Sequence, residues 1–173
     1  MKFSRLISIG FLSLILTAFG IETTQAQRSK GATNFVSLTS KLRECNRNGY
    51  FYWKSRNGNI SIGKQLEPYI ARVNFDSENT IYTLVCKINP KGTTQPFGTF
   101  RFTFGVDEFA SNVQIEVKVY LDGKITAGHT VNRGEIKTLL LDVANSEDMA
   151  IEFQTTNDGP YLYILDDNLV PLE

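Results

Sequence analysis

The sequence predicts an all-β protein that folds as a single-domain antiparallel β-sandwich. Three observations predict this class: clean alternation of apolar and polar residues, turn-forming pairs between the alternating runs, and no long segment of helical period. Strands that recur about every eight to twelve residues are typical of a sandwich or a barrel. Alternation in polarity favours the sandwich, because each of its sheets has one face toward solvent.

The chain begins with the pattern of a secretory signal peptide. Lys2 and Arg5 make a basic start, residues 6–21 are almost wholly apolar, and Thr24-Gln25-Ala26 supplies small residues for cleavage after Ala26. The apolar run is shorter than the roughly 20 residues that span a bilayer. We therefore predict a signal peptide over 1–26, a flexible leader over 27–34 and a β-sandwich domain over 35–173. The predicted location is secreted or periplasmic, with no membrane partner after cleavage.

Removing the signal peptide leaves 173 − 26 = 147 residues, enough for one domain with a sizeable core. Of the 18 basic and 18 acidic side chains, the removed segment holds Lys2, Arg5 and Glu22, so 16 and 17 remain. The exported chain therefore has a net charge near −1. Such a balance argues against nucleic acid or an anionic membrane as the partner.

Two cysteines remain after export, Cys45 and Cys86. In an oxidising compartment an even number favours a disulfide, and only one pairing exists; two buried free thiols are the alternative. The disulfide would close a loop of 86 − 45 = 41 residues. No metal site is predicted, because the only histidine, His129, has no cysteine or second histidine near it.

The first element of the domain is ambiguous. Phe35, Leu38 and Leu42 fit one face of a helix over residues 35–44, whereas FVSLT alone fits an edge strand, and both interpretations stay open.

The pattern then turns to β structure. Asn48-Gly49 and Asn57-Gly58 are hairpin signals that flank an aromatic strand over residues 50–54. Alternation predicts further strands over 60–62, 69–75 and 81–88. In the last of these Cys86 faces inward, so it can join the segment around Cys45 to the sheet. Residues 89–98 hold two prolines and two glycines and are predicted to be a loop.

The clearest alternation lies between Thr99 and Gly123. Phe100, Phe102 and Phe104 share one face of a strand, and a second alternating strand over residues 113–121 leads to Asp122-Gly123. Asp-Gly is a favoured pair for a two-residue hairpin turn. Alternation predicts four more strands, over 125–131, 139–143, 149–153 and 161–165, with turns at 132–134 and 157–160 between them.

The order of these segments resembles the NPCBM-type carbohydrate-binding module, which accompanies glycoside hydrolases of family 98. The resemblance rests on FRFTFGVDE, then VQIEVKVYLDGK, then GEIKTLLLDVANSEDMAIEFQTTND. In these segments Gly105-Val106-Asp107-Glu108, Asp122-Gly123 and Leu139-Leu140-Leu141-Asp142-Val143 occupy the places of the family's motifs. NISIGKQLEPYIARVNFDSENTIYTLV follows the family's order more loosely, and the glycine-rich and histidine-alanine motif before its last strand is absent.

The resemblance covers roughly residues 35–165. It implies a galactose-binding-like jelly roll and a role in holding sugars.

Sugar binding needs flat rings that stack on a pyranose face, together with polar side chains that bind the hydroxyl groups. Tyr50-Phe51-Tyr52-Trp53 is the densest aromatic cluster, and one pair of these rings should be exposed while the other is buried. Ordinary strand packing of all four rings is the alternative. The ligand-binding residues that we predict are Tyr50, Tyr52, Trp53, Arg56, Asn57, Asp107, Glu108 and Tyr161.

The usual signatures of catalysis are missing. His129 has no nucleophile motif near it, and Asp166 and Asp167 should point to opposite sides of an extended chain. No phosphate-binding loop or dinucleotide fingerprint occurs. No cofactor is predicted: a structural calcium ion is compatible with the loop carboxylates, but their spacing does not match an EF-hand.

The sequence therefore predicts a secreted, non-catalytic protein that binds a glycan through aromatic and polar residues at a loop edge. The alternative is a secreted structural or interaction protein, partnered by another protein, that keeps the sandwich but has lost the sugar site. The missing histidine-alanine motif favours that alternative. The sequence leaves the sugar and the oligomeric state open.

Overall fold

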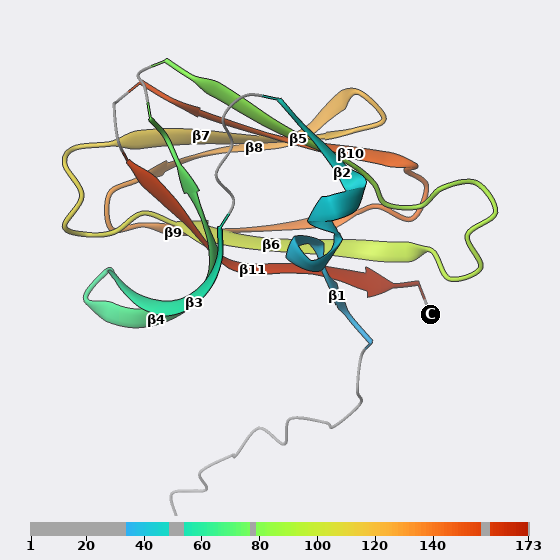
Figure 1. Ribbon diagram of the computed structural model, residues 1–173, viewed down its shortest axis with the longest axis horizontal. Coiled ribbons are helices and arrows are strands. Elements are labelled where there is room, and N and C mark those ends of the chain that lie inside the picture. The colour runs from blue at the N-terminus through green and yellow to red at the C-terminus, as the bar shows by residue number, and fades with distance from the viewer. Residues whose placement is uncertain (1–33, 49–53, 77–78, 157–159, 173) are drawn as a thin grey trace, which may run out of the picture. The chain divides into compact units, whose positions relative to one another are not determined.

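Two antiparallel sheets form the fold, and Figure 1 shows them as two layers. The first runs in the order β3 (Lys54–Ile62), β4 (Gln65–Asn74), β11 (Tyr161–Pro171), β6 (Phe97–Gly105) and β9 (Ile136–Asp142), with the short β1 (Val36–Ser37) also paired to β11. The second runs in the order β2 (Cys45–Asn48), β5 (Ile81–Lys87), β10 (Asp148–Thr155), β7 (Gln114–Leu121) and β8 (Lys124–Asn132). The predicted all-β sandwich is confirmed.

This computed structural model describes residues 34–48, 54–76, 79–156 and 160–172, all within the unit Ala32–Glu173. The predicted signal peptide, the leader up to residue 33, the turn at Asn48-Gly49 and the aromatic residues 50–53 lie wholly or partly outside the described residues. The same holds for most of the predicted turn at 157–160.

The core lies between the inner faces of the two sheets. Phe100, Phe102 and Phe104 of β6 are fully buried, as alternation predicts, and Phe153 of β10 contacts Phe102 from the opposite sheet. The ring centroids of Phe102 lie 5.5 Å from Phe100 and 5.1 Å from Phe104. Burying such rings supplies a large share of the hydrophobic stabilisation of a small domain.

The predicted turn at Asp122-Gly123 is also confirmed. Both residues have positive φ, 48° and 77°, as a two-residue hairpin turn of the primed type requires. The Asp122 carboxylate accepts hydrogen bonds from the backbone N–H groups of Glu147 and Asp148, each at 3.0 Å. These donors, that of Asp148 first, hold the pKa of Asp122 below its usual range. The turn is thereby fastened to the adjacent loop between β9 and β10.

The hairpin predicted at Asn57-Gly58 is wrong. Strand β3 continues through these residues, with an irregularity in its pairing to β4 between Ser55 and Gly58. The ring of Tyr69 lies against Gly58, where a Cβ atom would be 2.8 Å from the Tyr69 Oη. The glycine is therefore needed for a close approach and not for a turn. The chain turns instead at Gly63-Lys64, where φ is 57° and 67°.

Two strand boundaries also differ from those predicted, and the structure resolves the segment that was left open. The last strand continues from Leu165 to Pro171, and the loop after β5 ends before Phe97 because Phe97 and Gly98 already pair in β6. Residues 35–44 contain both of the structures left open: strand β1 is followed directly by a 3-10 helix, η1 (Leu38–Glu44). Leu38 and Leu42 of η1 are buried in the core.

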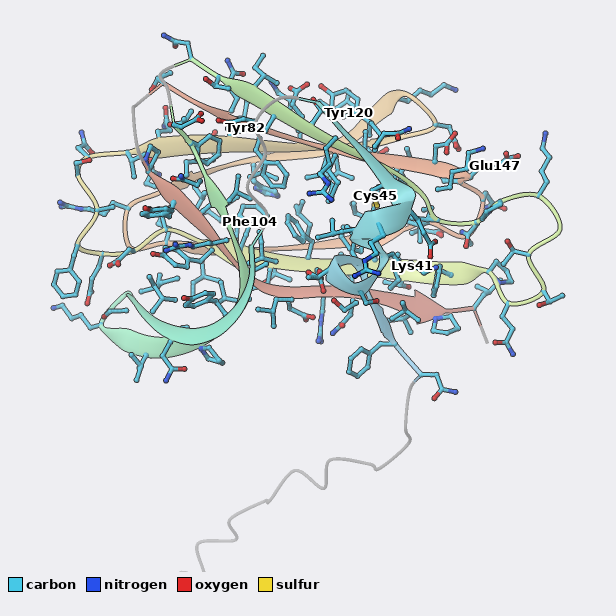
Figure 2. All side chains as sticks on the ribbon, viewed as in Figure 1. Lys41, Cys45, Tyr82, Phe104, Tyr120 and Glu147 are labelled. Carbon is cyan, nitrogen blue, oxygen red and sulfur yellow. A yellow bond between two sulfur atoms is a disulfide. The ribbon has the colours of Figure 1, made fainter. Side chains whose placement is uncertain are left out.

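The disulfide between Cys45 and Cys86 is present, which confirms the predicted pairing. The two cysteines face each other across the β2–β5 ladder, and Figure 2 labels Cys45 at the end of η1. Because β2 is an edge strand with β5 as its neighbour in the sheet, the disulfide fastens the N-terminal segment to the second sheet.

A buried carboxylate fastens the same segment to the first sheet. Asp167 of β11 is fully buried and accepts hydrogen bonds from the Ser37 hydroxyl and the Thr39 N–H, each at 2.6 Å, and from the Thr39 hydroxyl. Burial raises the pKa of Asp167, although these three donors favour the charged form. Residues 37–45 are therefore held at both ends, one against each sheet.

We expect Asp167 to make the stability of the protein depend on pH. Because the pKa of Asp167 is higher in the folded chain than its ordinary value of 3.8, the folded state binds the proton more tightly. Its contribution to stability is therefore fully present below pH 3.8 and is lost as the pH rises through the folded-state pKa.

Asp167→Asn, which does not titrate, removes this dependence. Chemical denaturation at a series of pH values measures the free energy of unfolding of both proteins. As the pH rises from 3.8 through the folded-state pKa of Asp167, the value for the wild type should fall relative to that for Asp167→Asn. A relative rise with pH would contradict the account.

Candidate functional site

The predicted ligand residues fall into two groups. Tyr50, Tyr52 and Trp53 lie outside the described residues. For Arg56 and Asn57 the structure describes only the backbone, within β3. Their roles stay predictions. Asp107, Glu108 and Tyr161 are described, and two of them lie in one cluster of side chains.

This cluster is built on the outer face of the first sheet. Leu162 and Ile164 of β11 are buried in the core. Because side chains alternate along a strand, Tyr161 and Tyr163 point to the opposite face of the sheet. Their ring centroids are 6.2 Å apart, and Tyr69 of β4 meets Tyr163 edge to face at 5.0 Å. Tyr163 is only 8% exposed, whereas Tyr161 is 36% exposed. Tyr161 is therefore the most exposed ring of this cluster, ahead of the partly buried Tyr69.

Arg72 adds a fixed cation to the cluster. It lies directly opposite Tyr163 in the β4–β11 ladder, so its side chain is on the same face as the rings. The Arg72 guanidinium carbon is 4.6 Å from the centroid of the Tyr161 ring, which is a cation–π distance. The guanidinium thus lies beside an accessible ring, and it carries several N–H donors.

Asp107 brings a carboxylate to the same place from the loop between β6 and β7. Tyr163 pairs with Gly105 at the end of β6, two residues before Asp107. Burial raises the pKa of Tyr163, and the negative charge of Asp107 raises it further. Asp107 Oδ1 accepts the N–H of Phe109 at 2.8 Å, so the carboxylate is oriented by its own loop.

Glu108, the neighbour of Asp107, joins two loops of the fold by hydrogen bonds. Its carboxylate accepts hydrogen bonds from the Ser61 hydroxyl and from the Lys64 N–H, the latter at 2.9 Å. Its own N–H donates to the Ser61 carbonyl oxygen at 3.1 Å. Glu108 thus fastens the β3–β4 turn to the loop that carries Asp107, and a ligand role for it stays a prediction.

Arg72, Tyr163 and Tyr69 are the members of the cluster that we did not predict. One signal was available in the sequence: in Tyr161-Leu162-Tyr163 the period of two places both rings on the face opposite a buried leucine. Arg72 likewise lies between the apolar Ala71 and Val73. The contact between β4 and β11 cannot be read from either strand alone, because it joins residues about 90 positions apart.

His129 is exposed on β8, and Asp166 and Asp167 contact different partners, Arg101 and the Ser37–Thr39 segment. Among the described residues, no group of three or more histidine, cysteine, aspartate or glutamate side chains could hold a metal ion. Within the same residues, none of the helices has both the length and the apolar character that crossing a membrane requires.

The structure is similar to those of carbohydrate-binding modules. One is CBM51 from Clostridium perfringens GH95 in complex with methyl-galactose, with a TM-score of 0.60 and 14% identity over 79% of this chain and 99% of that chain. Two others contain CBM51-2 and INT domains of Clostridium perfringens ZmpB, one of them with GlcNAc, with TM-scores of 0.55 and 0.54. Their identities are 16% and 15%, over 72% and 74% of this chain.

This chain spans 99% of the first module but only 29% and 30% of the two ZmpB chains. No protein-family model matches the sequence, and no curated protein matches it. The likeness in structure therefore shows the fold alone, an antiparallel β-sandwich like that of these carbohydrate-binding modules.

Proposed function

We propose that this protein is a non-catalytic glycan-binding protein, exported from the cell, whose site includes Tyr161, Arg72 and Asp107. The observation that carries the proposal is the accessible ring of Tyr161 with the guanidinium of Arg72 held 4.6 Å from its centroid. Asp107 lies at the loop edge of the same cluster. An aromatic ring, a multiple donor and an acceptor together match the two surfaces of a sugar, its apolar C–H face and its hydroxyl groups.

Each member of the cluster has a distinct part in binding. Tyr161 stacks on the pyranose ring, Arg72 donates to hydroxyl oxygens, and Asp107 accepts from hydroxyl groups. Tyr163 supports the accessible ring, because it is buried, lies next to Tyr161 and is itself held edge to face by Tyr69. A site held in this way loses little conformational entropy when the ligand binds.

The sequence supplies three further details of the proposal: the class of ligand, additional contact residues and the location. The resemblance to NPCBM-type modules supports sugar as the ligand, and Tyr50, Tyr52, Trp53, Arg56 and Asn57 are proposed as further contacts. The predicted signal peptide over 1–26 supports a secreted or periplasmic location, and the disulfide is consistent with an oxidising compartment.

Isothermal titration calorimetry with methyl-galactose and GlcNAc tests the site. These probes are the sugars bound by two of the similar modules. We expect Tyr161→Ala to weaken binding about tenfold, or about 1.4 kcal/mol, because it removes the stacking surface. Tyr161→Phe, which keeps the ring, should bind like the wild type.

The matched control is Tyr120→Ala, which makes the same change on β7 of the other sheet, where the Tyr120 hydroxyl contacts Glu152. This variant should retain wild-type affinity. Equal affinity of Tyr161→Ala and the wild type would remove Tyr161 from the site.

A further inference from the structure

A cleft lies on β11 where the neighbouring strand changes from β4 to β1. Along one edge β11 pairs with β4 through Ile164 and then with β1 from Asn168 onward. Between these residues the described structure places no strand against that edge. The pairing of β11 with β6 also shifts register between Ile164 and Asp166, so Leu165 is a bulged residue. Figure 1 shows the β3–β4 hairpin and β1 at different points along β11.

The cleft at this junction has a volume of about 520 Å³, which is within the range of small-molecule sites. Its walls come from β11, from Ile70 in the middle of β4 and from the N-terminal segment. Phe35 supplies a ring that is 59% exposed, and Asn168, Asp166 and Ser40 supply an amide, a carboxylate and a hydroxyl group. Ile70 and Leu165 form the apolar part of the wall.

The polar groups of the cleft are fixed by contacts outside it. The guanidinium of Arg101 on β6 binds the Asp166 carboxylate and orients it. The Ser40 hydroxyl donates to the Ser37 carbonyl oxygen at 2.6 Å. The buried Asp167 holds Ser37 and Thr39, so the wall formed by the N-terminal segment is itself anchored. The cleft is therefore formed before any ligand enters.

We propose that this cleft is a second saccharide subsite, which takes a mono- or disaccharide with its apolar face on Phe35 and vicinal hydroxyl groups on Asn168 and Asp166. The side-chain amide of Asn168 both donates and accepts, and the Asp166 carboxylate accepts, so together they match a pair of hydroxyl groups. The proposal rests on the proposed glycan-binding function. It adds a site separate from Tyr161, on a different stretch of β11.

NMR titration of the purified protein, with methyl-galactose and GlcNAc as probes, tests the subsite. The signals to follow are the side-chain amide of Asn168 and the backbone amides of Ser40 and Tyr161. In Tyr161→Ala, at least one sugar should still shift the Asn168 and Ser40 signals. Phe35→Ala should weaken that response about tenfold while leaving the response at Tyr161 unchanged, since a lost stacking contact is worth about this much.

The outcomes separate this inference from the proposed function. Shifts at Tyr161 without shifts at Asn168 and Ser40 overturn the subsite and leave the proposed function standing. Shifts at Asn168 and Ser40 without shifts at Tyr161 support the subsite and remove Tyr161 from the proposed site. Silence at Asn168 and Ser40 with both sugars overturns the subsite whatever happens elsewhere. The wild-type titration decides this even if a variant fails to fold.

Discussion

Reduction of the Cys45–Cys86 disulfide should lower the free energy of unfolding by about 4 kcal/mol, because the bond closes a loop of 41 residues in the unfolded chain. A closed loop of this length restricts the unfolded state much more than the folded one, in which β2 already lies beside β5. The expected result is a lower denaturant midpoint in the presence of a reductant. Equilibrium denaturation followed by circular dichroism measures it.

The double variant Cys45→Ala, Cys86→Ala is the control for this experiment. It should match the reduced wild type closely, and a reductant should leave its midpoint unchanged. An unchanged midpoint of the wild type after complete reduction would show that the bond does not stabilise the fold.

Phe102→Ala should destabilise the protein by about 4 kcal/mol, since it removes a fully buried ring from the centre of the sandwich. Phe102 contacts Phe100 and Phe104 along its own strand and Phe153 across the core. These neighbours are themselves fixed in two different sheets, so the cavity can collapse only in part. Denaturation with urea measures the change.

Phe109→Ala is a matched control, because it makes the same substitution in a side chain that is 81% exposed. It should change the free energy of unfolding by no more than about 0.5 kcal/mol. If the two variants were equally stable, β6 would not be the centre of the core.

Most of the strands could be predicted from the sequence because each of them carries its own evidence, whereas β2 (Cys45–Asn48) was not predicted. Alternation around Phe102 is a local pattern, and Asp122-Gly123 is a local turn signal that needs no distant partner. The pairing of Cys45 with Cys86 was predictable for a different reason, since no other pairing exists. The alternation and the turn depend only on short segments, and the disulfide depends only on the number of cysteines. The structure confirms all three.

Features that depend on contact between distant segments were not predictable in the same way. Asn57-Gly58 has the composition of a turn, but Gly58 serves the ring of Tyr69 in the neighbouring strand. The structural role of Asp167 could not be predicted, because nothing in the local sequence reveals that Ser37 and Thr39 donate hydrogen bonds to it.

The residues of the candidate site also divide into those that the local sequence predicts and those that depend on a distant contact. Asp107 and Tyr161 could be proposed from their residue types and from their places beside turns. Arg72 could not, because its role comes from lying opposite Tyr163 in a ladder between β4 and β11. The likeness to carbohydrate-binding modules supports the fold on which this cluster is built, while the cluster itself carries the proposal of sugar binding.

The most direct test of glycan binding is a glycan array probed with the wild-type protein and with Tyr161→Ala side by side. We predict that the wild type is retained on at least one glycan and that Tyr161→Ala gives a clearly weaker signal on the same one. Absence of wild-type binding to every glycan on the array, with the protein shown to be folded, would contradict the account and favour a structural or interaction role.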